Sequence, residues 1–534
     1  MNRQLQLRRA VDSWSISTVV VCLAILTPLA VIFLSVFKTA PDWQHIQSTV
    51  LTLYIGNTLF LVFAVGFVAF LFAAPTAWFV VYYDFPGKRW LSWALVLPLA
   101  IPTYVAAFTY YDLLDHTIPL IVAARKAWGF EASQRLEQIL RYGLLVLLMS
   151  SVLYPYIFFT LRASFMRQQA VFLEAGRMLG KSTGSIFWQI ALPLSRPALV
   201  AGLGLVAMEV INDYGAVNFF GAPTLTEGIF RTWFGLEDQA SAMRLALSMT
   251  VLVLILLGFE LWTRRRVRFA AGELEGHSLM PVRIRGYKGW LITFICIVPL
   301  FTGFLFPVFR LLHWAVLSFG DFDFSTIGPQ ITKSLILAAT TTVILGAVAL
   351  LFAFCGRVHP SLSLRRIIRV ATIGYAIPGA VIAVGVMTLF GTVDQMVSHH
   401  ILGGSLFALG FAYLIRFLTI AYQPLDAGMN SVGQSLLDAS FILGRSRIQT
   451  LLRIHLPLLM PVLLAASILV FIDILKELPL TLILRTSDFE TLATYAFGFA
   501  KEGAIYDCSI PSLCIILAGS VGLILANRWM RPST

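Results

Sequence analysis

The sequence from residue 173 to 197 reads LEAGRMLGKSTGSIFWQIALPLSRP, and residues 437–461 read LDASFILGRSRIQTLLRIHLPLLMP. The two stretches lie 264 residues apart. Each has an acidic residue followed by alanine, then a glycine, then a leucine–proline pair at matching positions. A repeat at a fixed offset indicates that a chain consists of related structural units. The sequence therefore predicts two related halves, each presenting the same short polar segment.

The composition is typical of a membrane protein. Of the 534 residues, 58% are hydrophobic and 12% are charged, whereas soluble domains contain about 25% charged residues. Apolar runs of about 20 residues can cross the ~30 Å bilayer core as helices. They predict an all-α polytopic membrane protein with twelve transmembrane helices in two parallel six-helix repeats. The runs lie near residues 14–37, 52–83, 90–111, 142–165, 195–220, 241–262, 290–318, 331–356, 367–391, 403–424, 458–483 and 508–527.

A basic linker around residues 263–289 interrupts the apolar pattern and separates the halves. The predicted domains are therefore an N-terminal half at residues 1–272 and a C-terminal half at residues 273–534. Each half holds an even number of spans, so both have the same orientation. An axis along the membrane normal would relate them, as it relates other parallel repeats.

A second repeated feature is an isoleucine–proline pair. Ile101-Pro102 in the third span corresponds to Ile377-Pro378 in the ninth, at an offset of 276 instead of 264. The difference implies about a dozen extra residues in the first half, consistent with the longer loop at about 112–141. We expect this loop to form a small helical excursion on the outer side.

The net charge of +12 could suggest nucleic-acid binding, but its distribution argues against it. Lys and Arg collect in alternate loops, including Arg264, Arg265 and Arg266 in the linker. The intervening loops are poorer in Lys and Arg, and some are acidic, such as the loop with Glu237 and Asp238. This is the positive-inside pattern of membrane proteins. It predicts that both termini, the linker and both repeated segments lie in the cytoplasm.

The repeated segments have the features of a short helix that lies across the membrane face. Gly180 and Gly444 follow the helical pattern, and glycine can adopt the positive φ that ends a helix. In the second copy, Ser435 and Asp438 make a weak match to a capping box, which would put Asp438 near the positive helix end. A small residue after the carboxylate allows another surface to approach closely. These features predict a docking segment for a soluble partner.

The pattern Glu-Ala-Gly…Gly…Ile-x-Leu-Pro resembles the EAA loop in the permeases of binding-protein-dependent ABC importers. Nearly the whole chain is similar to fused permeases of the ferric-iron type. The stretches that carry this likeness are MEVINDYGA at 208–216, RTWFG at 231–235, KELPLTLILR at 476–485 and TLA at 491–493. The resemblance implies the type I ABC importer permease fold, with type-1 transmembrane cores at about 52–262 and 330–527.

The resemblance also implies partners and an energy source. In this family the EAA helix docks into a groove on a cytoplasmic ATPase. Two ATPase copies would bind beneath the fused halves, and an extracytoplasmic binding protein would deliver the solute. The chain itself would bind no cofactor and have no catalytic residues, and ATP would be hydrolysed by the partner subunit. In the second copy, Asp438 stands where the family has Glu, and Ser440 stands where it has a small apolar residue. These replacements would weaken the binding of the second half to its ATPase. The implied ATPase-coupling residues are Glu174, Ala175, Gly180, Asp438, Ala439 and Gly444.

Two similarities to other protein classes are incomplete. Residues 176–182 resemble a P-loop, but position 175 is Ala where glycine is required, and no strand precedes it. Residues 84–89 resemble the loop signature of major facilitator transporters, but position 80 is Val instead of the expected glycine, which favours a short basic turn. We therefore expect ATP chemistry on another polypeptide. An ion-coupled secondary carrier is the alternative class of function.

Four carboxylates lie inside predicted spans. Glu209 and Asp213 belong to span five, and Asp473 and Glu477 occupy the same positions in span eleven. A charged residue in a span costs about 2.5–3.5 kcal/mol on insertion scales, so such residues tend to mark pathways or pairings. The i, i+4 spacing predicts that each pair shares one helix face. Two interpretations stand: a path for a cation, including a hard metal ion, or pairing with Lys476 and other polar groups that locks helices together.

The sequence predicts no resident metal. The five cysteines form no paired metal spacing, and His399-His400 has no cysteine or carboxylate nearby in sequence. Ferric iron is the expected solute by resemblance. Thiamine, polyamine and phosphonate are the alternatives, because permeases of this type often leave selection to the binding protein. We expect the chain in the bacterial inner membrane.

Overall fold

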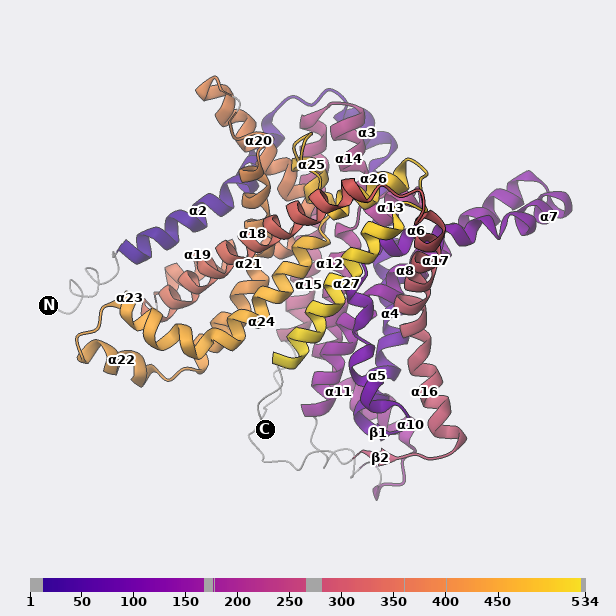
Figure 1. Ribbon diagram of the computed structural model, residues 1–534, viewed down its shortest axis with the longest axis horizontal. Helices are drawn as coiled ribbons and strands as arrows, with labels where there is room; N and C mark the ends of the chain where they lie inside the picture. Colours follow the sequence, from indigo (N-terminus) through magenta and orange to yellow (C-terminus); the bar gives the residue numbers. More distant parts are fainter. Residues whose placement is uncertain are drawn as a thin grey trace.

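The computed structural model describes residues 13–167, 176, 178–265, 281–359, 361–399 and 401–529. Figure 1 shows a bundle built almost entirely of helices. Ten of the described helices are long and apolar enough to cross a membrane, or up to twelve when each of two bent helix pairs counts as one span. The predicted all-α polytopic fold is confirmed.

The first half extends from α2 to α15, and the second from α16 to α27. The first contains α2 (Ser13–Leu34), η1 (Ser35–Phe37), α3 (Trp43–Thr49), α4 (Leu51–Tyr82), β1 (Tyr83–Asp84), α5 (Lys88–Ala94), η2 (Leu97–Ala100), α6 (Thr103–Asp115), α7 (Ile118–Trp128), α8 (Phe130–Arg167), α10 (Thr183–Ile186), η3 (Phe187–Ala191), α11 (Leu192–Leu194), α12 (Arg196–Asn212), α13 (Gly215–Phe219), α14 (Leu225–Phe230), η4 (Arg231–Gly235) and α15 (Gln239–Arg265). The linker strand β2 (Val282–Arg283) precedes the second half, which contains α16 (Tyr287–Leu300), η5 (Phe301–Leu305), α17 (Phe306–Ser318), α18 (Phe324–Val358), α19 (Leu362–Ala371), η6 (Gly374–Ala376), α20 (Gly379–Val397), α21 (Leu406–Ser431), α22 (Gln434–Ile442), α23 (Arg447–Thr450), η7 (Leu451–His455), α24 (Leu456–Leu475), α25 (Pro479–Leu484), α26 (Leu492–Lys501) and α27 (Ser509–Trp529).

The bundle has two ends, which Figure 1 separates clearly. One end carries α10, α22 and the paired strands β1 and β2, and we call it the α22 side. The opposite end carries α3, α14 and α25, and we call it the α25 side. The predicted helical excursion is α7 together with the beginning of α8, joined at Gly129, and this hairpin projects from the body at the right of Figure 1.

The third span bends where the sequence has its isoleucine–proline pair. Lys88–Ala100 and Thr103–Asp115 meet there at 90°. Proline disfavours helical geometry in the residue before it, and the backbone at Ile101 is accordingly extended. Ile377 and Pro378 make the same kind of junction between η6 and α20. The predicted correspondence of the two pairs is therefore confirmed.

The first helix of each half lies against the other half. α2 packs on α18, α19 and α20, and the rings of Trp14 and Phe354 meet edge to face at 5.7 Å. In return, α16 and α17 contact α4, α5 and α6, and the Tyr110 hydroxyl donates to the Thr302 backbone oxygen at 2.8 Å. Helices in a bilayer associate through close packing and hydrogen bonds. The halves are thus joined by packing as well as by the covalent linker.

The described end of the linker is attached to the first half. β2 pairs in parallel with β1, the strand that follows α4, and Ile284 N–H donates to the Asp84 backbone oxygen at 2.9 Å. The Thr293 hydroxyl of α16 donates to the Pro86 backbone oxygen at 2.7 Å. Residues 84–89 form the expected short turn, with Gly87 at a φ of +79°. This turn and the linker therefore hold α16 against α5.

One glycine sets the closest approach inside the second half. Gly374 of η6 lies against α21, and a Cβ at this position would collide with the Ile415 backbone oxygen. We expect Gly374→Ala to lower the stability of the purified chain by about 1–3 kcal/mol, the usual range for overpacking. It should also displace the neighbouring Tyr375. The measurement is the thermal unfolding of the chain in detergent. Gly356→Ala in α18 is the control, because nothing lies within 4 Å of its added Cβ; equal stability of both variants would contradict the prediction.

Candidate functional site

The second repeated segment forms an exposed helix with a sharp end. α22 carries Asp438 and Ala439 on its exposed surface and ends at Gly444, whose φ is +73°. Arg445 N–H donates to the Ser440 backbone oxygen at 3.1 Å, and Gly444 N–H to that of Phe441 at 3.0 Å. These two bonds are those of a Schellman motif. The predicted glycine stop is confirmed.

The predicted capping box in this segment is wrong. The residue before α22 is Gly433, which has no side chain that could cap this helix end. The Ser435 side chain lies beyond the cap position because α22 begins at Gln434. A capping box does occur in the next helix, where Ser446 and Gln449 exchange hydrogen bonds at the beginning of α23.

The first repeated segment shares this local structure where it is described. Glu174 and Ala175 lie outside the described residues. Gly180 has a φ of +73°, equal to that of Gly444, and Lys181 N–H donates to the Gly176 backbone oxygen at 3.1 Å. Each segment then continues through a short helix into a π-helical turn, η3 or η7, ahead of its leucine–proline pair. The repeat in sequence is therefore a repeat in backbone structure.

The two copies pack their turns differently. A Cβ on Gly176 would lie 2.9 Å from Ile190 Cδ1, so a larger residue there would require this isoleucine side chain to shift. The equivalent position in the second half is Ser440, which is buried and whose hydroxyl lies 3.0 Å from the Thr450 hydroxyl. Ser440 therefore fixes the fold of its own segment and is not part of the exposed surface.

Exposed apolar side chains lie beside both glycines. Met178 and Leu179 are 89% and 78% exposed, and their counterparts Ile442 and Leu443 are 85% and 78% exposed. Large apolar side chains gathered on a polar end of a protein commonly mark an interaction surface. The two segments thus present matched surfaces on the α22 side.

The four intramembrane carboxylates lie where two spans end. α12 ends at Asn212 and α24 at Leu475, and each is followed by a short helix, α13 or α25. Asp213 accepts from Ala216 N–H at 2.8 Å and from Val217 N–H at 3.3 Å, while Glu477 accepts from Leu480 N–H at 3.0 Å. A carboxylate at this position satisfies free amides of a helix N-terminus. Asp213 and Glu477 therefore have the same structural role in both halves.

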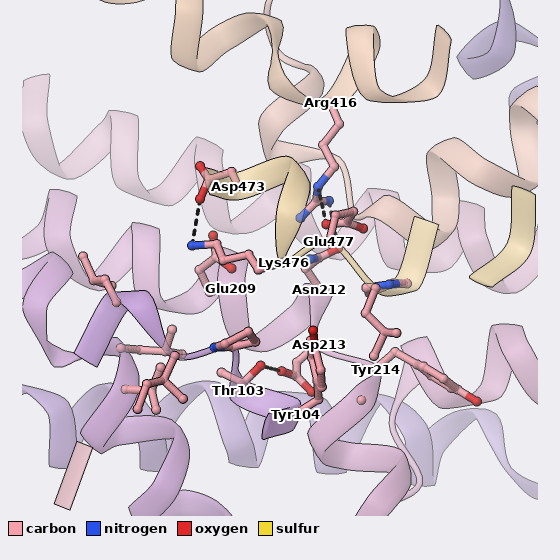
Figure 2. Close-up of a pocket in the computed structure, with 18 of the residues that line it drawn as sticks. Thr103, Tyr104, Glu209, Asn212, Asp213, Tyr214, Arg416, Asp473, Lys476 and Glu477 are labelled. Atoms are coloured by element: carbon pink, nitrogen blue, oxygen red, sulfur yellow. Dashed lines mark hydrogen bonds and ion pairs between the residues drawn. The ribbon is translucent and has the colours of Figure 1, made fainter. Parts of the chain in front are cut away.

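The prediction that each carboxylate pair shares one helix face is wrong. The chain leaves the helix before the second member of each pair, and Asp213 is already extended. Glu209 and Asp473 remain on the last turns of α12 and α24. All four nevertheless line one cavity of about 80 Å³ together with Arg416 and Lys476. Figure 2 shows these side chains converging on a common space from both halves.

Two ion pairs and a set of hydrogen bonds organise this cavity. Glu477 pairs with Arg416 Nε at 3.3 Å, and both side chains are buried. Asp473 pairs with Lys476 at 2.7 Å, in agreement with the partner expected for the locking interpretation. Thr103 donates a hydrogen bond to Asp213. The cavity is therefore polar and largely paired.

Several of these bonds join the two halves. Asn212 accepts from Gly379 N–H at 2.6 Å and from Arg416 at 2.9 Å. Glu209 accepts from the Tyr375 hydroxyl at 2.5 Å and from the Tyr156 hydroxyl at 3.5 Å. Sequence reasoning missed Arg416, although an arginine within an apolar span was a usable signal. It also missed both tyrosines, which no local pattern distinguishes from other aromatic residues.

A second, larger cavity of about 530 Å³ adjoins the first. The two share the side chains of Tyr156, Tyr375, Asp473 and Lys476. The larger cavity is mainly apolar and extends to the last turns of α27 and the end of α5. Among the described residues, no group of three or more His, Cys, Asp or Glu side chains could hold a metal ion.

Comparison with known proteins identifies the family. Residues 66–269 and 343–532 each match the family described as the inner membrane component of binding-protein-dependent transport systems. A Fe(3+)-transport system permease protein of Haemophilus influenzae is 24% identical over 483 residues, which cover 89% of each chain. A probable sulfate transport system permease protein of Chlorokybus atmophyticus is 31% identical over 35% of this chain and 60% of its own length. A sulfate transport system permease protein of Escherichia coli is 28% identical over 38% of this chain and 72% of its own length.

These relatives are transport permeases and not enzymes. The two family matches fall in the two structural halves and together cover more than half of the sequence. The duplication that the repeated segment predicted is therefore a duplication of one permease unit. The chain belongs to the family of inner membrane components of binding-protein-dependent transport systems, with two permease units fused in one polypeptide.

Proposed function

We propose that this chain is the membrane subunit of an importer for ferric iron. An extracytoplasmic binding protein delivers the ion, and two copies of a separate ATPase drive its passage into the cytoplasm. The chain binds no ATP itself. The observation that supports ferric iron as the substrate is the similarity to a Fe(3+)-transport permease over 89% of both chains. The repeated surfaces around Gly180 and Gly444 support docking of two ATPase copies.

The charges in the cavity favour a cation over sulfate, the solute named for the shorter relatives. Four carboxylates and two cationic side chains line the space. Such a balance repels a divalent anion and attracts a small cation in a medium of low dielectric constant. The family assignment supports ATP coupling over an ion-coupled carrier.

The basic loops support an orientation in which the α22 side faces the cytoplasm. Arg445 and Lys181 lie directly after the two positive-φ glycines, and Lys88 and Arg89 follow β1 on the same side. Both termini and the linker would then be cytoplasmic. The larger cavity would open toward the cytoplasm, on the route by which the ion leaves.

The proposal is tested by uptake into proteoliposomes that contain the chain, its ATPase and its binding protein. We expect ATP-dependent ferric uptake that ceases when the ATPase is omitted and survives an uncoupler. Uptake of sulfate instead of iron, or collapse of uptake by the uncoupler, would refute it.

The pathway role of the carboxylates is tested in the same assay. We expect Glu209→Gln combined with Asp473→Asn to reduce ferric uptake by roughly tenfold or more. A tenfold reduction corresponds to a rise of about 1.4 kcal/mol in the barrier to transport. Expression and thermal stability should be retained. Glu137→Gln is the control, since Glu137 pairs with Arg141 on the surface of α8. Full transport by the double variant would defeat the pathway role and leave the carboxylates as structural groups.

A further inference from the structure

Glu209 differs from the other three carboxylates of the cavity. Asp213 and Glu477 are held by backbone amides, and Asp473 is held by Lys476. Within the described part of the chain, Glu209 has neither kind of partner, although Lys476 lies nearby (Figure 2). Its hydrogen bonds come from Tyr375 and Tyr156. The side chains of Glu209, Tyr156 and Tyr375 thus meet through their oxygen atoms. Among the described residues, no cationic side chain and no backbone amide is bonded to the Glu209 carboxylate.

A fourth oxygen lines the same cavity. Tyr104 is 3% exposed, and its hydroxyl has no hydrogen-bond partner among the described residues. A buried hydroxyl without a partner costs free energy of about 1–3 kcal/mol. Such a group is expected where a bound species or water completes the site. The cavity therefore has unused capacity to bind through oxygen.

We propose that Glu209, Tyr156 and Tyr375 form a transient all-oxygen binding site for Fe³⁺ on its way through the permease. This inference rests on the proposed function, because it assigns the ligands of the proposed solute. Hard cations prefer oxygen ligands, and carboxylate and phenolate oxygens are the hardest that side chains provide. On binding, the two phenol O–H bonds break, the protons pass to water, and two Fe–O bonds form without any redox change.

The size of the site matches this chemistry. A cavity of about 80 Å³ exceeds the roughly 10–15 Å³ that one water molecule needs on the same measure, so it has room for a metal ion with several water molecules. We expect the site to accept the ion after the binding protein has released it.

The site also lies at the passage between the two cavities. Tyr156 and Tyr375 line both cavities, whereas Glu209 lines only the smaller one. In this proposal, an ion moving toward the α22 side passes the two tyrosines, beside Asp473 and Lys476, which also line both cavities. Tyr375 comes from the second half, and Glu209 and Tyr156 come from the first. Movement of one half relative to the other would remove a ligand and weaken binding, as transport requires.

The test uses the full chain in lipid nanodiscs, titrated with ferric nitrilotriacetate. Bound Fe³⁺–phenolate gives a visible charge-transfer absorption band, and we expect this band for the unaltered chain. Tyr375→Phe and Tyr156→Phe should each weaken the band, and the double variant should lose it. Tyr154→Phe is the matched control, because Tyr154 lies two residues from Tyr156 on α8, bonds to the Leu95 backbone oxygen at 2.8 Å and lines neither cavity.

The outcomes separate this site from the proposed function. Absence of the band in the unaltered chain, or its survival in the double variant, would overturn the site even if ferric uptake in proteoliposomes is normal. A band that depends on both tyrosines would support the site. Failure of the complete transporter to take up ferric iron would refute the proposed solute, whatever the titration shows.

Discussion

Replacing Gly180 and Gly444 together by valine is expected to abolish the association of the ATPase with this chain. Both glycines have a φ of +73°, and no atom of the described residues lies within 4 Å of a Cβ added at either position. The effect would thus come from the backbone and not from a steric clash with a neighbour. A left-handed conformation costs a residue with a Cβ about 1–2 kcal/mol, and β-branching increases the cost. Each helix end would therefore rearrange.

The rearrangement would affect the surface that we propose for docking. Leu179 and Leu443 directly precede the glycines, and both are 78% exposed. A change in the glycine backbone redirects these side chains and breaks the bonds from Lys181 and Arg445 that close the motif. Two segments dock two ATPase copies in the proposal, so altering both removes both contacts.

Co-purification of the ATPase with the tagged chain measures this effect. Gly503→Val is the matched control, because Gly503 has a φ of +84°, has open space at its Cβ and ends α26 on the opposite side of the bundle. This variant should bind the ATPase normally. If the ATPase still associates with the Gly180→Val/Gly444→Val chain, the assignment of the two segments as coupling segments is wrong.

Local features of the sequence predicted most of the backbone. Apolar length predicted the spans, the isoleucine–proline pairs predicted corresponding positions in the two halves, and Gly444 predicted the end of α22. Each of these depends on residues close together in the chain, where steric rules act directly. The cap of α22 was predicted wrongly because a serine at Ser435 satisfies the pattern without being at the helix boundary.

The contents of the cavity were only partly predictable. The 264-residue offset between the repeats identified Glu209 and Asp473. Asp473 and Lys476 lie three residues apart, so their pairing follows from helical spacing. The pairing of Glu477 with Arg416 joins the segment after α24 to α21, so its two residues are far apart in the sequence. Such a contact depends on how helices pack, and no short-range pattern in the sequence encodes it.

The two halves are alike in backbone and unlike in chemistry. Asp213 and Glu477 cap equivalent helices, yet Asn212 in the first half corresponds to Lys476 in the second. In a homodimer, symmetry would impose the same residue at both positions. Fusion removes this constraint, so one carboxylate can take a lysine partner while Glu209 keeps two tyrosines. The asymmetry of the cavity thus depends on two units of different sequence, which this chain carries in one polypeptide.

Arg416→Met is expected to be the most destabilising single substitution in the cavity. Arg416 and Glu477 are about 5% and 6% exposed, so neither charge reaches solvent. Removing one partner of a buried pair leaves the other charge uncompensated and costs about 3–5 kcal/mol. Asn212 would also lose the hydrogen bond from Arg416. Thermal unfolding of the purified chain in nanodiscs should show a large fall in the midpoint.

A second substitution separates the loss of charge balance from the loss of packing. In Arg416→Met/Glu477→Gln, no unpaired charge remains, and the glutamine oxygen can still accept from Leu480 N–H. Much of the stability should therefore return, because replacing both members of a buried pair is often nearly neutral. Arg141→Met is the comparison, since its pair with Glu137 is partly exposed and should contribute about 0.5 kcal/mol or less. If Arg416→Met is no worse than Arg141→Met, the Arg416–Glu477 pair does not stabilise the fold as a buried charge pair. If the double variant is as unstable as Arg416→Met, the arginine acts through its packing and its bond to Asn212 instead of its charge.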